Sequence, residues 1–144
     1  MRSVSAEDSD QSNMTPEWKN AVRRGSLNDL QRLAAAGADI NARDEYGQSA
    51  LMHAAVKGDD EVVEWLVERG AELDHAAKYG LSALMLAVVN GRLNVVRTLL
   101  RAGANLALRG TGAPGLAGKT ALEIAIARDD KEMVKLLHGR DSQE

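Results

Sequence analysis

The sequence predicts an all-α solenoid of about four stacked helix-turn-helix repeats, with β-turn fingers between them. Three observations predict it: internal repetition every 33 residues, glycines that keep the same step, and apolar residues at helical spacing in each copy. A helix of about ten residues is marginally stable alone, so the copies must stack to cover their apolar sides. We therefore expect one domain over residues 15–140, with repeats at 15–43, 44–76, 77–109 and 110–140.

The repetition is clearest in the middle of the chain. The segment that begins at Tyr46 and the one that begins at Tyr79 share 15 of 29 aligned residues. A degenerate copy precedes them, and another follows after five extra residues, because Gly80 and Gly118 lie 38 positions apart. Two glycine series share the 33-residue step: Gly25, Gly58 and Gly91, and Gly37, Gly70 and Gly103.

Each copy is expected to form a helix, a tight turn, a second helix and a loop. In the second copy Ser49 is placed to cap the first helix, and Gly58 to end it in a left-handed conformation. Acidic residues from Asp59 onward suit the start of the second helix. Its apolar side follows at helical spacing: Val62, Val63, Leu66 and Val67.

The two terminal copies differ from the central ones in ways that suit the ends of a stack. Thr15-Pro16 opens the first copy, since proline fits a first helical turn. Asp129 stands where the last copy would carry a helix-ending glycine, and Asp tolerates that backbone shape. We expect residues 1–14 to be a disordered tail and 141–144 a short one. The terminal copies carry the extra polar residues that caps need: Lys19, Arg23, Gln31, Arg32, Lys131 and Lys135.

These residues resemble the ankyrin-repeat family over roughly residues 15–140. GQSALMHAA, GLSALMLAV and GKTALEIAI are similar to its Gly-x-Thr-Pro-Leu-His-x-Ala-Ala signature, and VVEWLVERGAELD to its second helix and Gly-Ala turn. The Ala-Leu-Met pattern and the short stack look like bacterial members. The chain departs from the pattern at two signature positions, where the family has Pro and then His: Ala50, Ala83 and Ala121, and Met52, Met85 and Glu123. Apolar packing by methionine is expected to replace the histidine's bond between repeats.

The composition argues against a disulfide-bonded, secreted or membrane-spanning protein. The chain has no cysteine, which removes disulfides and thiolate chemistry and is compatible with a reducing compartment. The amino end lacks the apolar stretch of a secretory signal, and no apolar run approaches a membrane span. We expect a cytoplasmic, monomeric protein without a membrane segment.

No pattern indicates an enzyme, a cofactor or a metal site. Ala113 to Thr120 satisfies a relaxed phosphate-loop motif, but a phosphate loop needs a preceding buried strand and a parallel sheet. The ankyrin register also explains the Gly-Lys-Thr, so an elongated, flexible finger is the simpler interpretation. The three histidines, His53, His75 and His138, show no ligand spacing. The acids from Asp59 lie at a helix start, and no cleft is indicated that would separate their pKa values.

The resemblance implies binding through the finger tips and the exposed side of the first helices. Those positions hold eight of the 18 basic residues and one of the 21 acidic residues, although the whole chain has a net charge of −3. Such a basic concave face would attract an anionic partner, and tyrosine beside arginine is typical of interface hot spots. The residues expected to contact a partner are Arg43, Glu45, Tyr46, Gln48, Lys57, Lys78, Tyr79, Leu81, Arg109, Lys119 and Arg128.

Three functions stay open on this basis. The first is a non-catalytic protein–protein interaction module, a scaffold or adaptor that binds an acidic protein segment. The second is a nucleic-acid or other polyanion binder on the same face, although few aromatic residues are present for base stacking. The third is nucleotide binding at Ala113 to Thr120. The five-residue insertion could add a contact of its own or only accommodate extra chain, and each tyrosine could simply pack on its own finger.

Overall fold

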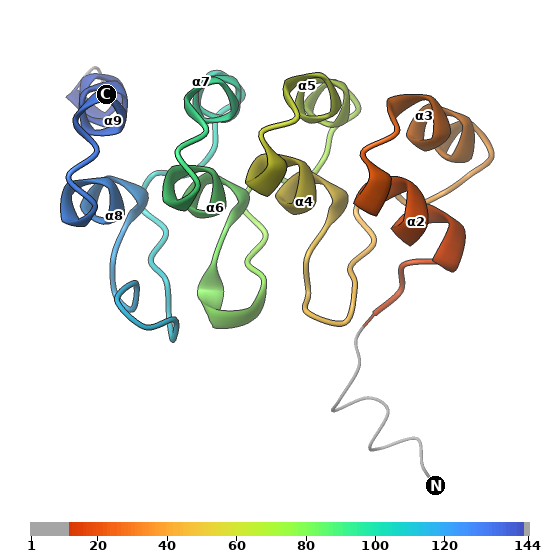
Figure 1. The fold of residues 1–144 in the computed structure, drawn as a ribbon, viewed down its shortest axis with the longest axis horizontal. Coiled ribbons are helices and arrows are strands. Elements are labelled where there is room, and N and C mark those ends of the chain that lie inside the picture. Colours follow the sequence, from red (N-terminus) through yellow and green to blue (C-terminus); the bar gives the residue numbers. More distant parts are fainter. Residues whose placement is uncertain (1–11, 143–144) are drawn as a thin grey trace, which may run out of the picture.

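In the computed structural model, which describes residues 12–142, four helix pairs stand side by side in a row (Figure 1). The first helices of the pairs form one layer, the second helices form another, and the fingers project beyond the first layer. No strand occurs among the described residues, so the prediction of an all-α solenoid is confirmed. The elements are α2 (Pro16–Arg24), α3 (Leu27–Ala35), α4 (Ala50–Lys57), α5 (Asp60–Glu68), the short 3-10 helix η1 (Lys78–Gly80), α6 (Ala83–Val89), α7 (Leu93–Arg101), α8 (Ala121–Ala127) and α9 (Lys131–Ser142).

Side-chain caps fix where most of these helices begin. Ser49 accepts from the Met52 amide at 3.4 Å, and Ser82 does the same for Met85 at 3.2 Å. Such bonds satisfy amides that have no partner within the first helical turn. The prediction of a Ser49 cap is confirmed.

Left-handed residues end the first helices. Gly25 and Gly58 have φ values of 68° and 76°, a region that residues with a Cβ atom rarely enter. Asp129, at the corresponding turn of the last repeat, has a φ of 56°, as expected from its place in the alignment.

The core runs continuously between neighbouring pairs. Leu51, Leu84 and Ile124 occupy the centre and are nearly inaccessible to solvent. Met52 and Met85, which replace the family histidine, are each 1% exposed. Methionine packing therefore takes over at these two positions, as the sequence predicts.

Hydrogen bonds repeat between the pairs with the same 33-residue step. The Asn41 side chain accepts from the Glu72 amide at 3.0 Å, and one repeat later Asp74 accepts from Asn105 at 2.8 Å. These bonds tie each loop to the next loop, so they fix the spacing of the fingers as well as that of the helices.

The structured part of the chain extends slightly beyond the predicted boundaries. Asn13 and Met14 fall in the predicted amino-terminal tail, but the Asn13 side chain accepts from the Arg43 amide at 2.8 Å, and Met14 is buried. At the other end α9 continues to Ser142. The rest of the predicted tail, residues 1–11, lies outside the described residues.

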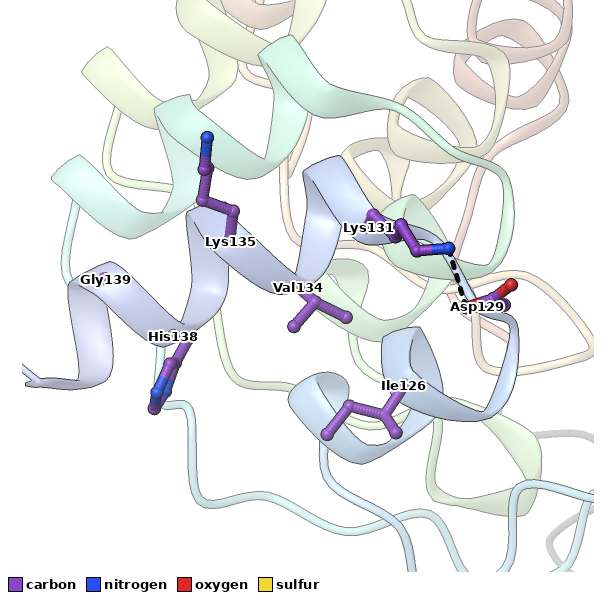
Figure 2. A pocket seen from close by; sticks show the side chains of 7 residues that line it. All are labelled: Ile126, Asp129, Lys131, Val134, Lys135, His138 and Gly139. Carbon is purple, nitrogen blue, oxygen red and sulfur yellow. Dashed lines mark ion pairs between the residues drawn. The ribbon is translucent and has the colours of Figure 1, made fainter.

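The last pair leaves one side uncovered by any described residue (Figure 2). Ile126 on α8 is 56% exposed. Lys131 and Lys135 on α9 are exposed too, in keeping with the polar character expected of a terminal repeat.

Candidate binding surface

The structure places the eleven expected contact residues on three fingers and at two helix ends. They lie on the finger before α4 (Arg43, Glu45, Tyr46 and Gln48), at the end of α4 (Lys57), on the finger before α6 (Lys78, Tyr79 and Leu81), on the finger before α8 (Arg109 and Lys119) and directly after α8 (Arg128). We call these residues the finger face.

Two tyrosines are the most exposed large apolar groups of the finger face. Tyr46 is 57% exposed and Tyr79 is 50% exposed. Their fingers are joined through the main chain, because the Lys78 amide donates to the Tyr46 carbonyl at 3.3 Å and the Thr111 amide to the Tyr79 carbonyl at 2.7 Å. The two rings are therefore held one repeat apart on a connected row of fingers, while Leu81 is half buried against the core.

Tyr79 contacts groups on both sides of it. The Lys78 ammonium lies 5.9 Å from the centre of its ring, within the range of a cation–π contact. A Cβ atom at Gly112 would lie 3.1 Å from the ring, so Tyr79 rests against the next finger rather than only against its own.

Acidic neighbours reduce the positive charge of this region. Arg43 lies 3.5 Å from Glu72, and Arg109 lies 3.1 Å from Glu123. The Thr120 amide and, beyond it, Arg109 hold the pKa of Glu123 below its usual value, so this acid stays ionised. Lys119 and Arg128, by contrast, have no ion pair in the part of the chain that the structure describes.

The Lys57 ammonium is bonded to the main chain of the preceding repeat and is not free to contact a partner protein. Its ammonium donates to the Val22 carbonyl at 3.3 Å and also to the Arg23 carbonyl, at the end of the preceding first helix. The Val22 carbonyl also accepts from the Gly25 amide at 3.1 Å, so Lys57 adds a second donor at the end of α2. One repeat later, Arg92 donates to the Val56 carbonyl at 2.9 Å in the same way. Lys57 therefore holds two repeats together.

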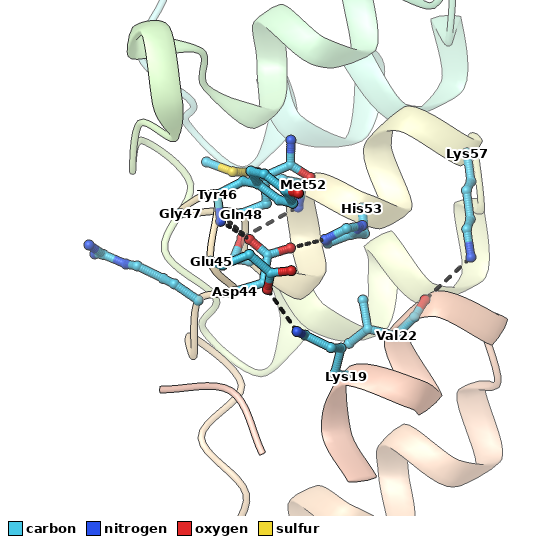
Figure 3. A network of polar contacts seen from close by, with 12 residues as sticks. Lys19, Val22, Asp44, Glu45, Tyr46, Gly47, Gln48, Met52, His53 and Lys57 are labelled. Carbon is cyan, nitrogen blue, oxygen red and sulfur yellow. Dashed lines mark hydrogen bonds and ion pairs between the residues drawn. The ribbon is translucent and has the colours of Figure 1, made fainter. Parts of the chain in front are cut away.

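A polar network at the first interface was missed by the sequence analysis (Figure 3). Asp44 is 5% exposed and accepts from His53 and from the amides of Tyr46 and Gln48, at 2.8, 2.9 and 2.9 Å. Burial raises the pKa of Asp44, but these bonds outweigh it, and the pKa lies below its ordinary value.

A comparison of the repeats could have found this network. Ala77 and Gly110 occupy the position of Asp44 in the later repeats, and Leu86 and Ile124 that of His53. Two polar exceptions nine residues apart in the same copy are a signal of mutual contact.

A hollow of about 440 Å³ adjoins this network between the first two repeats. The Lys19 ammonium bonds to Glu45 at 2.7 Å at its edge, and this bond raises the pKa of Lys19 and lowers that of Glu45. Tyr46 and Gln48 also line the hollow, so it connects the finger face with the side of α2 that bears Lys19.

Three ankyrin-repeat copies are matched by a family model over residues 18–110, well over half of the chain. The chain belongs to the ankyrin-repeat family. Ankyrin repeats generally mediate protein–protein interactions, and they are typically non-enzymatic.

Two curated relatives share single stretches with this ankyrin-repeat protein. It is 43% identical over 42 residues to a G patch domain and ankyrin repeat-containing protein 1 homolog of Drosophila melanogaster, covering 29% of this chain and 12% of that protein. It is also 43% identical over 47 residues to a mitochondrial disaggregase of Bos taurus, covering 33% of this chain and 7% of that protein. Each match thus spans about a tenth of the relative's length. The resemblance to bacterial members of the family stays a prediction.

The segment that resembles a phosphate loop forms the inserted finger and the cap of α8, as the alignment of the ankyrin repeats predicts. Thr120 caps α8 by accepting from the Glu123 amide at 3.2 Å, while the Glu123 carboxylate accepts from the Thr120 amide at 3.1 Å. Main-chain bonds close the inserted finger, because the Gly118 amide donates to the Gly110 carbonyl at 2.8 Å. No buried strand precedes the loop among the described residues, so the support that a phosphate loop needs is missing there.

Within residues 12–142, no group of three or more potential ligand side chains could hold a metal ion. None of the described helices has both the length and the apolar character required to cross a lipid bilayer.

Proposed function

We propose that this ankyrin-repeat domain is a non-catalytic adaptor that binds an acidic segment of another protein through its finger face. The proposal rests mainly on the row of connected fingers that bear Tyr46 and Tyr79, with the Lys78 ammonium beside the Tyr79 ring. Tyrosine offers a large contact area at a low cost in conformational entropy, and it is common among interface hot spots. The cytoplasmic location and the monomeric state belong to this proposal.

The positive charge of the finger face supports an acidic partner. The support is weaker than a count of its basic residues suggests, because acidic neighbours neutralise some of them. Arg43 and Arg109 have acidic neighbours of their own, so Lys78, Lys119 and Arg128 supply most of the remaining attraction. We expect these three cations to raise the association rate more than the final affinity, because exposed charges chiefly steer encounter.

The test compares two double variants that change the net charge equally. Lys78→Glu with Lys119→Glu alters the finger face, whereas Arg97→Glu with Arg101→Glu alters the exposed side of α7. Lys57 is unsuitable for this purpose because its ammonium bonds to the preceding helix.

Each variant is immobilised and used to capture proteins from the native host, with mass spectrometry as the readout. We expect the finger-face variant to lose at least one partner that the wild type and the α7 variant both retain. Equal capture by all three proteins would contradict the proposal. Binding to generic RNA and DNA that weakens steeply with salt would favour the polyanion alternative instead.

A further inference from the structure

The carboxyl-terminal end of the stack exposes positions that are buried in the repeats before it. Ile126 aligns with Ala55 and Val88, both of which are fully buried, yet Ile126 is 56% exposed. Val134 aligns with Val63 and Val96, also fully buried, and is only half buried. Among the described residues, none covers most of Ile126, and Val134 is covered only in part. These two side chains form the floor of what we call the end face.

The end face is a shallow, open hollow of about 470 Å³ between α8 and α9. In Figure 2 Val134 on α9 and Ile126 on α8 lie one above the other on the same side of the pair, and the other repeats lie behind. In the interior of the stack, the first helix of the next repeat packs against this side of each pair, as α8 packs on α6. The shape of the end face therefore suits a helix with an apolar stripe.

The rim of the hollow is basic. Lys131 and Lys135 line it beside His138, and Asp129 is the one acid among its lining residues. Asp129 already faces Lys131 at 3.6 Å, with both side chains more than four-fifths exposed. A helix whose apolar stripe is flanked by carboxylates would complement this rim.

We propose that the end face binds an amphipathic helix of a partner protein whose apolar stripe is flanked by acidic residues. This is a second interaction surface, distinct from the finger face. The helix would extend the stack by one layer, with Ile126 and Val134 beneath its apolar side and Lys131 and Lys135 beside its carboxylates.

A second copy of the chain fits the end face less well. Two end faces packed against each other would bring Lys131 and Lys135 of both copies together. Docking end to end would place Ile126 against the first repeat, where the described residues include no large exposed apolar side chain. Acidic flanks on the occupant avoid both difficulties.

The proposal is tested with a stapled, fluorescein-labelled helical peptide of about 15 residues. It carries leucines at positions i, i+4, i+7 and i+11, with glutamates on both sides of this stripe. A matched peptide replaces every glutamate with lysine. Binding is followed by fluorescence anisotropy with the full chain, and sedimentation velocity reports its state of association.

We expect the acidic peptide to bind at least about tenfold more tightly than the basic one. Ile126→Ser should weaken its binding about tenfold or more, since truncation of a central anchor commonly has this effect. Lys131→Glu with Lys135→Glu should also weaken it. Lys78→Glu with Lys119→Glu should have little effect, which separates this proposal from that for the finger face.

Circular dichroism checks that Ile126→Ser remains folded, which we expect because the side chain is largely exposed. Equal binding of the two peptides, or unchanged binding by Ile126→Ser, would overturn the proposal. It would also fail if the wild type formed dimers that Ile126→Ser dissociates, because the end face would then be an interface between copies.

Discussion

Asp44 shows how a buried carboxylic acid can remain ionised between the repeats of an all-α stack. Its carboxylate receives three donors from within one repeat: the His53 ring and two finger amides. These donors favour the ionised form more than burial disfavours it. The residue therefore fixes the shape of the finger that carries Tyr46, and it links that finger to α4.

We expect Asp44→Asn to lower the free energy of unfolding by about 1–3 kcal/mol at neutral pH, the range for lost bonds to a buried charged group. The pKa of Asp44 is lower in the folded state than in the unfolded state. Its contribution is therefore complete above about pH 4 and declines as the pH falls further. Urea unfolding of wild type and variant at about pH 7 and pH 3 checks both statements.

Glu64→Gln is the control for this experiment, because Glu64 is exposed on α5. It should change the free energy of unfolding little at either pH. A difference between wild type and Asp44→Asn that stays the same at about pH 3 would show that the carboxylate charge is not the cause.

At the scale of the element, the end of each first helix is stabilised by the repeat that follows it. Lys57 and Arg92 both reach back to carbonyls at the end of the preceding first helix. The turn glycine lies beside each contact, and more tightly at the second: a Cβ atom would lie 3.7 Å from the Lys57 ammonium at Gly25, but 2.8 Å from the Arg92 side chain at Gly58. Gly91, in the same place one repeat later, has open space around its Cα atom.

Gly58 and Gly91 give a matched pair of variants. Both have left-handed backbones, with φ values of 76° and 70°. Gly91→Ala should lower the free energy of unfolding by about 1–2 kcal/mol through backbone strain alone. Gly58→Ala should lower it by about 0.5–1 kcal/mol more, because the new methyl group displaces the Arg92 bond.

Chemical denaturation measures both free energies. Repeating the comparison in an Arg92→Ala background should remove the excess for Gly58→Ala, since the displaced side chain is then gone. An excess that persists in that background would mean that Arg92 is not responsible.

At the scale of the whole molecule, a repeat stack is stabilised mainly by contacts between neighbours. The first pair, α2 and α3, packs against one neighbouring pair among the described residues, whereas the α6 and α7 pair packs against two. The first pair should therefore unfold before the rest when it is weakened. Trp18, which is buried in α2, offers a local probe of this event.

We expect Leu30→Ala to separate the unfolding of the first repeat from that of the others. In a Trp65→Phe background, the Trp18 fluorescence transition should occur at a lower urea concentration than the circular dichroism transition. Leu99→Ala, in the third repeat, should lower the free energy of unfolding by about 2–5 kcal/mol. It should therefore shift both transitions to lower urea concentration. Leu30 and Leu99 are both nearly inaccessible, at 1% and 0% exposed, so burial is matched. Coincident transitions in the Leu30→Ala variant would argue for a fully cooperative stack.

The stack could be predicted from the residues alone, because the signals for it are local and are repeated. The serine before each first helix, the glycine after it and the apolar spacing within it specify a hairpin. The 33-residue period then requires the hairpins to pile up. Even Asp129 could be assigned a left-handed backbone from its place in the alignment, since backbone conformation depends on nearby residues.

Which charged groups are available for binding, by contrast, depends on how the repeats pack against one another. Lys57 and Lys78 look alike in the sequence, yet one bonds to the carbonyls of the preceding helix and the other lies over a tyrosine ring. The exposure of Ile126, where Val88 is fully buried, likewise follows from the packing of the repeats and not from the local pattern. Such contacts depend on side-chain conformations between repeats, for which a local pattern carries no information.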